Sequence, residues 1–150
     1  MTKRVLVAGV GNVFLGDDGF GVEVVRRLGS LAWPAGVDVV DFGIRSLDLA
    51  YALSDGYDLV VLVDATRRGR APGTLYVIEP EPSPPGLVEA HAMVPDTVLG
   101  LARGMVRVVG CEPASIPADD EIHVGLSEVV ARSIEPAIEL VSQLVEQAHA

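Results

Sequence analysis

The sequence predicts an α/β fold: a single three-layer domain over residues 1–150, with a mainly parallel twisted sheet of about five strands and helices on both faces. Two observations carry this prediction. Segments with strand-like and helix-like patterns alternate along the chain. In addition, the segment Leu59–Ala65 (LVVLVDA) begins with five successive apolar residues, which is typical of a strand covered by helices on both faces.

The first half of the chain supplies three strands and two helices. The strands are expected at Arg4–Val10, Gly36–Phe42 and Leu59–Ala65. Apolar residues at helical spacing predict a first helix from about Gly19 to Leu28. A second, short helix begins near Leu47 and ends at the Asp55-Gly56 turn.

The second half begins with a fourth strand, GTLYVIE, which ends at Glu79. The loop that leads to it is too short for a crossover helix, so we expect this strand to run antiparallel at an edge of the sheet. The connector Pro80–Gly86 holds four of the ten prolines and reads as stiff and exposed. A third helix is expected to begin near Pro95 or Asp96 and to end before Arg107.

The last two elements are a fifth strand, VRVVGC, and a long terminal helix. Ser127 suits the N-cap position of this helix, and apolar residues then recur at helical spacing. Pro136 interrupts the pattern, so the helix is expected to kink or to restart there.

Composition limits the classes of binding partner and the cellular compartment that we expect. The formal net charge of -10 argues against nucleic acid and anionic membranes, since both are bound mainly through Lys and Arg. A single cysteine, Cys111, fits a reducing compartment, and no segment reaches the roughly 20 apolar residues that span a bilayer. We expect a cytoplasmic protein, and a monomer because no amphipathic stripe is left over.

The glycine-rich loop after the first strand fits a dinucleotide site poorly, although nucleotide binding stays an alternative. Gly9 and Gly11 occupy the first two places of a G-x-G-x-x-G motif, but Phe14 occupies the third. Asp17 and Asp18 would also place two negative charges against the phosphates. The glycines are instead expected to turn the chain sharply, so that the next helix starts beside the binding crevice.

Acidic side chains at the carboxyl ends of strands are the candidate site residues, because ligands bind at this edge of α/β sheets. Asp64 ends the most buried strand. Of the two loop acids, Asp17 is expected to cap the following helix and Asp18 to face the crevice. Asp18, Asp64 and His91 together would form a two-carboxylate, one-imidazole set that suits a divalent metal. For His123 a structural role is the simpler interpretation.

Two further features lie on the same edge. Cys111 follows the fifth strand and is either a nucleophile or, more simply, a small buried residue. The basic segment RRGRAPG, from Arg67 to Gly73, follows Asp64 in an otherwise acidic protein. It is a solvated turn or a site for an acidic or C-terminal peptide group.

Motifs along nearly the whole chain resemble those of the hydrogenase maturation endopeptidases. GVGNVFLGDDGFGV is similar to the opening motif of that family, and LVVLVDA followed by APGTL is similar to its second segment. His91, in AHAMVPDTVLGLA, lies where the family places its third segment. VVGCEP, HVGLS and SIEPAIELV resemble later landmarks, whereas DFGIRSLDL departs from the Gly-Gly-Thr type of some members, which bears on substrate choice.

The resemblance implies an endopeptidase that removes a C-terminal extension from a nickel-iron hydrogenase large-subunit precursor after nickel insertion. By position, the metal-contacting residues of the family fall on Asp18, Asp64 and His91, and the catalytic carboxylates on Asp18 and Asp64. The metal is expected to be nickel carried by the substrate, with a resident ion as the open variant. The alternatives are a non-catalytic metal-binding chaperone of the same subunit, and a Cys111-dependent hydrolase.

Overall fold

The computed structural model describes residues 3–80, 96–118 and 121–149. Within these residues five strands form one sheet in the order β2-β1-β3-β5-β4. The strands are β1 (Val5–Val10), β2 (Val37–Gly43), β3 (Leu59–Ala65), β4 (Leu75–Ile78) and β5 (Met105–Cys111). All neighbours are parallel except β4 and β5, which confirms the predicted antiparallel strand at the edge.

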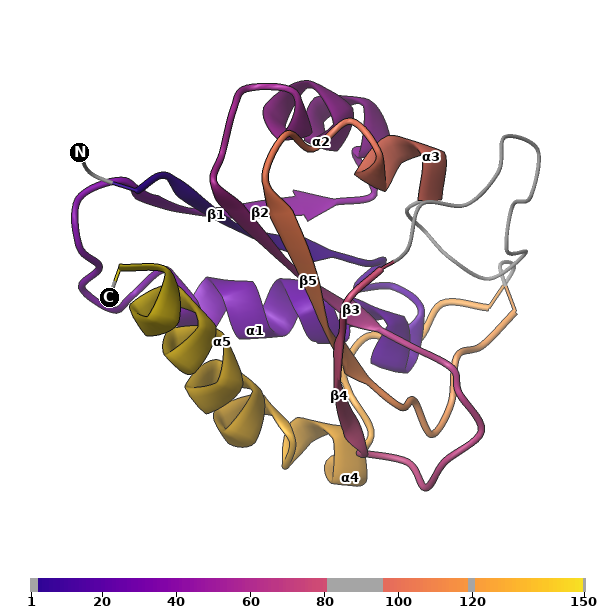
Figure 1. Ribbon diagram of the computed structural model, residues 1–150. Coiled ribbons are helices and arrows are strands. Elements are labelled where there is room, and N and C mark those ends of the chain that lie inside the picture. The colour runs from indigo at the N-terminus through magenta and orange to yellow at the C-terminus, as the bar shows by residue number, and fades with distance from the viewer. Residues whose placement is uncertain (1–2, 81–95, 119–120, 150) are drawn as a thin grey trace.

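Helices cover both faces of the sheet (Figure 1). They are α1 (Phe20–Leu28), α2 (Ser46–Leu53), α3 (Asp96–Leu99), α4 (Glu128–Ala131) and α5 (Ile134–His149), with a short 3-10 helix, η1 (Gly16–Gly19), before α1. Figure 1 shows α1 and α5 on one face, and α2 and α3 on the other. The predicted three-layer α/β architecture is therefore confirmed.

The two central strands alternate between two apolar cores. Odd-numbered residues of β1 and β3, such as Val7 and Val61, pack with buried residues of α1 and α5. Even-numbered residues, such as Leu6 and Val60, pack with Leu49 and the rest of the α2 side. Because successive side chains of a strand point to opposite faces, both faces of a central strand must be apolar, as the run in β3 predicted.

Two expectations about helices need correction or refinement. The third helix is only one turn long, because the chain leaves helical geometry at Gly100 and continues through i→i−3 turns to Ala102. The expected terminal helix is divided into α4 and α5. Pro136 lies in the first turn of α5, where its missing N–H costs no hydrogen bond, so the predicted restart is confirmed.

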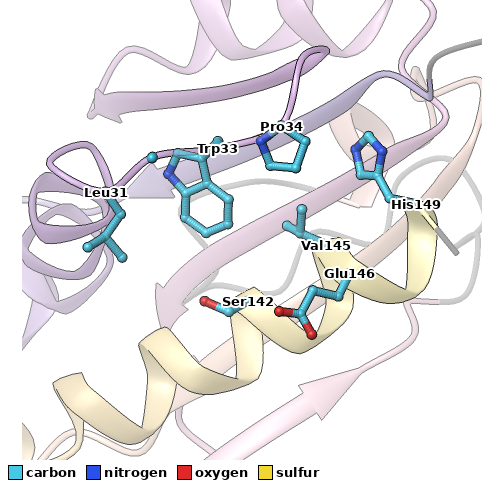
Figure 2. Close-up of a pocket in the computed structure, with 8 residues that line it drawn as sticks. Leu31, Trp33, Pro34, Ser142, Val145, Glu146 and His149 are labelled. Carbon is cyan, nitrogen blue, oxygen red and sulfur yellow. The ribbon is translucent and has the colours of Figure 1, made fainter.

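A shallow hollow lies between the loop before β2 and helix α5. Figure 2 shows Trp33 and Pro34 facing Val145 and His149 across it. The Trp33 indole N–H donates to the backbone oxygen of Leu28 at 2.8 Å, which fixes one wall. The hollow is at the amino edge of the sheet, away from the loops that carry the candidate site. In the described part of the chain, no helix has the length and apolar character to cross a membrane.

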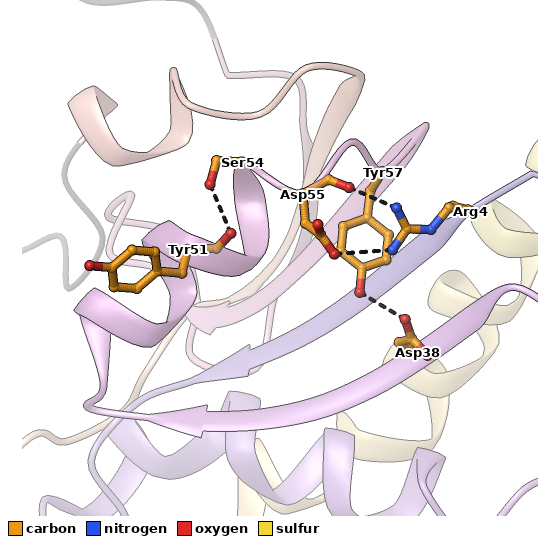
Figure 3. Close-up of polar contacts among 6 residues, drawn as sticks. All are labelled: Arg4, Asp38, Tyr51, Ser54, Asp55 and Tyr57. Atoms are coloured by element: carbon orange, nitrogen blue, oxygen red, sulfur yellow. Dashed lines mark hydrogen bonds and ion pairs between the residues drawn. The ribbon is translucent and has the colours of Figure 1, made fainter.

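A polar cluster ties together the amino ends of β1, β2 and β3 (Figure 3). The Arg4 guanidinium donates to the backbone oxygen of Asp55 at 2.7 Å and lies over the Tyr57 ring, 4.6 Å from its centroid. The Tyr57 hydroxyl donates to Asp38 Oδ2 at 2.7 Å. Burial and this hydrogen bond raise the pKa of Tyr57 to about 12.

We expect the Tyr57→Phe variant to lose about 1 kcal/mol of unfolding free energy, because the Asp38 carboxylate loses a donor in a partly buried position. The matched control is Tyr51→Phe, since Tyr51 is 70% exposed and Figure 3 shows its hydroxyl pointing away from the cluster. Urea unfolding of both variants measures the difference. Equal stability of the two variants would contradict a structural role for the Tyr57 hydroxyl.

The same bond predicts a pH dependence. The folded protein holds the Tyr57 proton more tightly than the unfolded chain, so its stabilising effect is complete below the ordinary tyrosine pKa of about 10. It is lost as the pH rises towards about 12. The stability difference between wild type and Tyr57→Phe should therefore shrink over this range, which equilibrium unfolding at a series of pH values measures.

Candidate active site

The loop after β1 is shaped so that Asp18 is fixed beside the end of that strand. Gly11 has a φ of 141°, and a Cβ at this position would lie 2.0 Å from the backbone oxygen of Asp18. Only glycine permits this contact. The backbone N–H of Asn12 donates to Asp18 Oδ2 at 2.9 Å. The first part of the glycine-rich loop therefore positions a carboxylate rather than a phosphate.

A second close contact brings the start of α1 against β3. A Cβ on Gly21 would lie 2.1 Å from the backbone oxygen of Val63, the residue before Asp64. Helix α1 can therefore begin directly beside the carboxyl end of the central strand. Since Asp18 precedes this turn by three residues, the packing places it near Asp64, as the expected role of the glycines requires.

Asp64 lies near the end of β3 and carries a buried carboxylate oxygen. Its Oδ1 atom is buried and, among the described residues, receives no hydrogen bond. Burial raises the pKa of the Asp64 carboxyl well above its usual range, and the negative charge of Asp18 raises it further. The backbone N–H of Ala65 donates to the carboxylate and opposes the shift. Two predicted site residues are thus brought together as an electrostatically coupled pair.

The pair fits a cation in its chemistry. Carboxylate oxygens are hard ligands, and a buried oxygen without a donor is stabilised by a positive charge or by a proton. Two carboxylates are fewer than the three protein ligands of most catalytic metal sites, and the described residues contain no group of three His, Cys, Asp or Glu side chains that could hold a metal ion. His91, the third predicted ligand, lies outside the described residues.

The expectation that Asp17 caps the following helix is wrong. The N-cap residue of α1 is Gly19, which makes no side-chain capping bond. The Asp17 carboxylate is buried and accepts hydrogen bonds from the backbone N–H groups of Ala114, Ser115 and Ser127 and from the Ser127 hydroxyl, at 2.7–3.0 Å. Asp17 therefore joins three remote segments of the carboxyl edge.

Ser127 and His123 contribute to the same frame. Ser127 occupies the N-cap position of α4 as predicted, but its hydroxyl donates to Asp17 instead of capping the helix. His123 exchanges backbone hydrogen bonds with the loop after β1: its N–H donates to Phe14, and its oxygen accepts from Gly16. Both contacts are made by the backbone, so the structural role expected for the His123 side chain stays a prediction.

Glu112 is a further acid at the carboxyl edge of the sheet, directly after β5, and it was not among the candidates predicted from the sequence. It is buried, and its Oε1 accepts from the backbone N–H groups of Arg68 and Arg70 and from the Tyr76 hydroxyl, at 2.6–3.1 Å. Burial opposes its ionisation, but these donors prevail and lower the pKa of Glu112. An acid directly after a buried strand was the available signal, the same one that identified Asp64.

Cys111 is enclosed in the core, with no exposed surface. Burial raises the pKa of its thiol to about 11. A thiol nucleophile needs an accessible thiolate, usually with a pKa below that of free cysteine. The geometry therefore favours the simpler interpretation of Cys111 as a small buried residue and disfavours the Cys111-dependent hydrolase.

Together, these features define a three-layer α/β protein whose binding edge presents coupled carboxylates instead of a phosphate loop. The chain belongs to the hydrogenase maturation protease family: the HycI model, described as hydrogenase maturation protease, matches residues 22–144. The peptidase class and the earlier resemblance are thereby confirmed.

Individual relatives agree with this assignment. The chain is 30% identical over 148 residues to the hydrogenase 2 maturation protease of Escherichia coli, covering 92% of this chain and 88% of that protein. Its fold superposes on the hydrogenase maturating endopeptidase HybD from E. coli with a TM-score of 0.80 and 28% identity, over 97% and 93% of the two chains. It also superposes on a hydrogenase 2 maturation peptidase from a Thaumarchaeota archaeon with a TM-score of 0.75 and 32% sequence identity, over 96% of this chain and 99% of that chain.

The two adjacent aspartates should differ sharply in their effect on stability. We expect Asp17→Asn to lower the unfolding free energy by about 3 kcal/mol, since the amide turns a donor towards buried N–H groups. Asp18→Asn, the matched control, should cost less than about 1 kcal/mol. Chemical denaturation of both variants measures this. A larger loss for Asp18→Asn would reverse the assigned roles.

The Cys111 thiol should be unreactive in the folded protein. At pH 8 its pKa of about 11 leaves roughly 200-fold less thiolate than in the unfolded chain, whose cysteine has a pKa of about 8.5. The reaction rate with Ellman's reagent, measured with and without denaturant, should differ at least by this factor. Rapid reaction of the folded protein would restore the thiol nucleophile as a candidate.

Proposed function

We propose that the protein is an endopeptidase that removes the C-terminal extension of a nickel-iron hydrogenase large-subunit precursor after nickel insertion. The observation that carries the proposal is the buried Asp64 Oδ1, which has no hydrogen-bond donor among the described residues and belongs to a carboxylate that also experiences the negative charge of Asp18. The pair lies at the carboxyl edge of an α/β sheet in a member of the hydrogenase maturation protease family.

In this proposal the carboxylates meet the nickel that the substrate carries. Asp18 and Asp64 contact the metal, and His91 completes the contact. The ion offsets the cost of burying two negative charges, so a precursor with nickel binds more tightly than one without it. The charge coupling thus makes metal loading a condition for cleavage.

Peptide hydrolysis requires that a water molecule attacks the scissile carbonyl and loses a proton. A carboxylate at the crevice can accept that proton and pass it to the leaving amine. Asp64 suits this role, because burial and the Asp18 charge raise its pKa well above its usual range, which makes the carboxylate a stronger proton acceptor. A carboxylate that only orients the water, or a resident metal that polarises it, is the close variant.

The surface around the pair supports a protein-sized substrate. Large apolar side chains are exposed on loops of this edge. They are Phe14 and Ile44, which follow β1 and β2, and Ile122 and Val124, which flank the bridge of His123 to Leu15. Exposed apolar groups with polar surroundings are typical of protein interaction surfaces. A monomer in a cytoplasmic, reducing compartment, suggested by the single free cysteine, belongs to the same proposal.

The test is mass spectrometry of a nickel-loaded and a nickel-free large-subunit precursor after incubation with the protein. We expect loss of the extension only from the nickel-loaded form, and a rate at least about 100-fold lower for Asp18→Asn and for Asp64→Asn. The matched control is Asp55→Asn, which changes an exposed acid at the opposite edge of the sheet.

Stability measurements separate chemistry from folding. Asp64→Asn should be at least as stable as wild type, since it removes a buried charge next to another carboxylate. Full activity of both site variants would refute the proposed roles. A stable complex between wild type and the precursor, without any change in precursor mass, would instead identify a non-catalytic chaperone.

A further inference from the structure

The turn Arg67–Arg70, between β3 and β4, concentrates positive charge at the candidate site. It carries three of the eleven Lys and Arg residues of a chain whose formal net charge is -10. The turn begins three residues after Asp64. All of its residues are exposed, so the three guanidinium groups lie on the rim of the carboxyl edge.

The arginines of this turn are not used in ion pairs within the described residues. Every ion pair there involves another arginine, namely Arg4, Arg26, Arg27, Arg45, Arg107 or Arg132. Arg68 lies over the Tyr76 ring, 5.9 Å from its centroid. In a protein with 21 acidic residues, three neighbouring guanidinium groups without a carboxylate are available for an external anion.

The backbone of the turn is held in place from below. Buried Glu112 accepts the N–H groups of Arg68 and Arg70 at 2.8 and 3.1 Å, so this nearby carboxylate binds the backbone rather than a guanidinium group. The ends of the loop are also fixed, because Thr66 donates to Cys111 and Gly73 donates to Glu112, both at 2.8 Å. The backbone of the turn is therefore ordered before a ligand binds, so binding costs little backbone entropy.

The position of the turn suits the part of a substrate that leaves after cleavage. Arg70 is six residues from Asp64, so their Cα atoms are at most about 20 Å apart. An extended peptide advances about 3.3 Å per residue. A chain end within about six residues of the scissile bond can therefore reach the turn.

We propose that the Arg67–Arg70 turn is a carboxylate-binding subsite for the acidic, carboxylate-terminated segment on the C-terminal side of the cleaved bond. The inference rests on the proposed peptidase function. Any such segment ends in an α-carboxylate, and the planar arginine fork binds carboxylates through two parallel hydrogen bonds. In a strongly acidic protein, a local basic group is also required to hold an anionic peptide end.

Binding is tested without cleavage by fluorescence anisotropy. The probe is the peptide Gly-Ala-Gly-Ala-Glu-Glu with an uncharged BODIPY dye and a free C-terminus, compared with Gly-Ala-Gly-Ala-Gln-Gln-amide. We expect wild type to bind the acidic peptide at least tenfold more tightly, and the difference to shrink between about 0.05 M and about 0.5 M NaCl. Equal binding of the two peptides would overturn the proposal.

The kinetics of precursor cleavage then show whether the turn acts on substrate binding or on the chemical step. The Arg67→Gln/Arg70→Gln variant should raise KM about tenfold, since each exposed ion pair contributes up to about a factor of five, with a much smaller change in kcat. The matched control is Arg103→Gln. Arg103 is exposed, precedes β5 at the opposite edge, and forms no ion pair within the described residues. An unchanged KM in the double variant would contradict the subsite.

The two proposals fail in different ways. If wild type cleaves no precursor but binds the acidic peptide through Arg67 and Arg70, the carboxylate-binding site stands, whereas the peptidase function and the assignment of the site to a cleaved segment fail. If wild type cleaves the nickel-loaded precursor and neither amidation of its C-terminus nor the double variant alters KM, the peptidase function stands and the subsite fails. Thermal melting confirms that each variant is folded.

Discussion

The carboxylate of Asp17 accepts hydrogen bonds from the loop after β5 and from the start of α4, while its own backbone belongs to the loop after β1. Its partners are 97–110 residues away in the sequence. One buried anion therefore sets the relative position of three segments that meet at the carboxyl edge. With the edge fixed in this way, the neighbouring Asp18 is held by the backbone of Asn12 and is coupled to Asp64.

Three acids at the same edge differ because their hydrogen-bond donors differ. Asp17 has four donors and is a structural residue. Glu112 has the backbone of the arginine turn and the Tyr76 hydroxyl, which keep it ionised. Asp64 has an oxygen with no donor among the described residues and a second carboxylate nearby. Within the described residues, its charge is offset only in part, by the backbone N–H of Ala65. A buried charge that is poorly compensated in this way is typical of functional sites.

Charged groups of both signs lie at the carboxyl edge of the sheet. Coupled carboxylates suit a cation, whereas the exposed arginines a few residues along the chain suit an anion. Glu112 accepts hydrogen bonds from the backbone of the arginine turn and not from its guanidinium groups, which therefore stay exposed to solvent. A substrate that carries both a metal ion and an anionic chain end would match this arrangement, which relates the proposed function to the proposed subsite.

By itself, the sequence determined the alternating α/β order, the doubly covered strand β3, the antiparallel edge strand, and two acids at the carboxyl edge, Asp18 in the loop after β1 and Asp64 in β3. These features depend on local patterns and on the rule that parallel strands end at one edge. Only the tertiary structure decided that Asp17 is no helix cap, that Glu112 anchors the arginine turn, and that Asp64 Oδ1 has no donor in the described part of the chain. Whether a buried carboxylate is satisfied depends on donors from remote segments, and local sequence does not contain them.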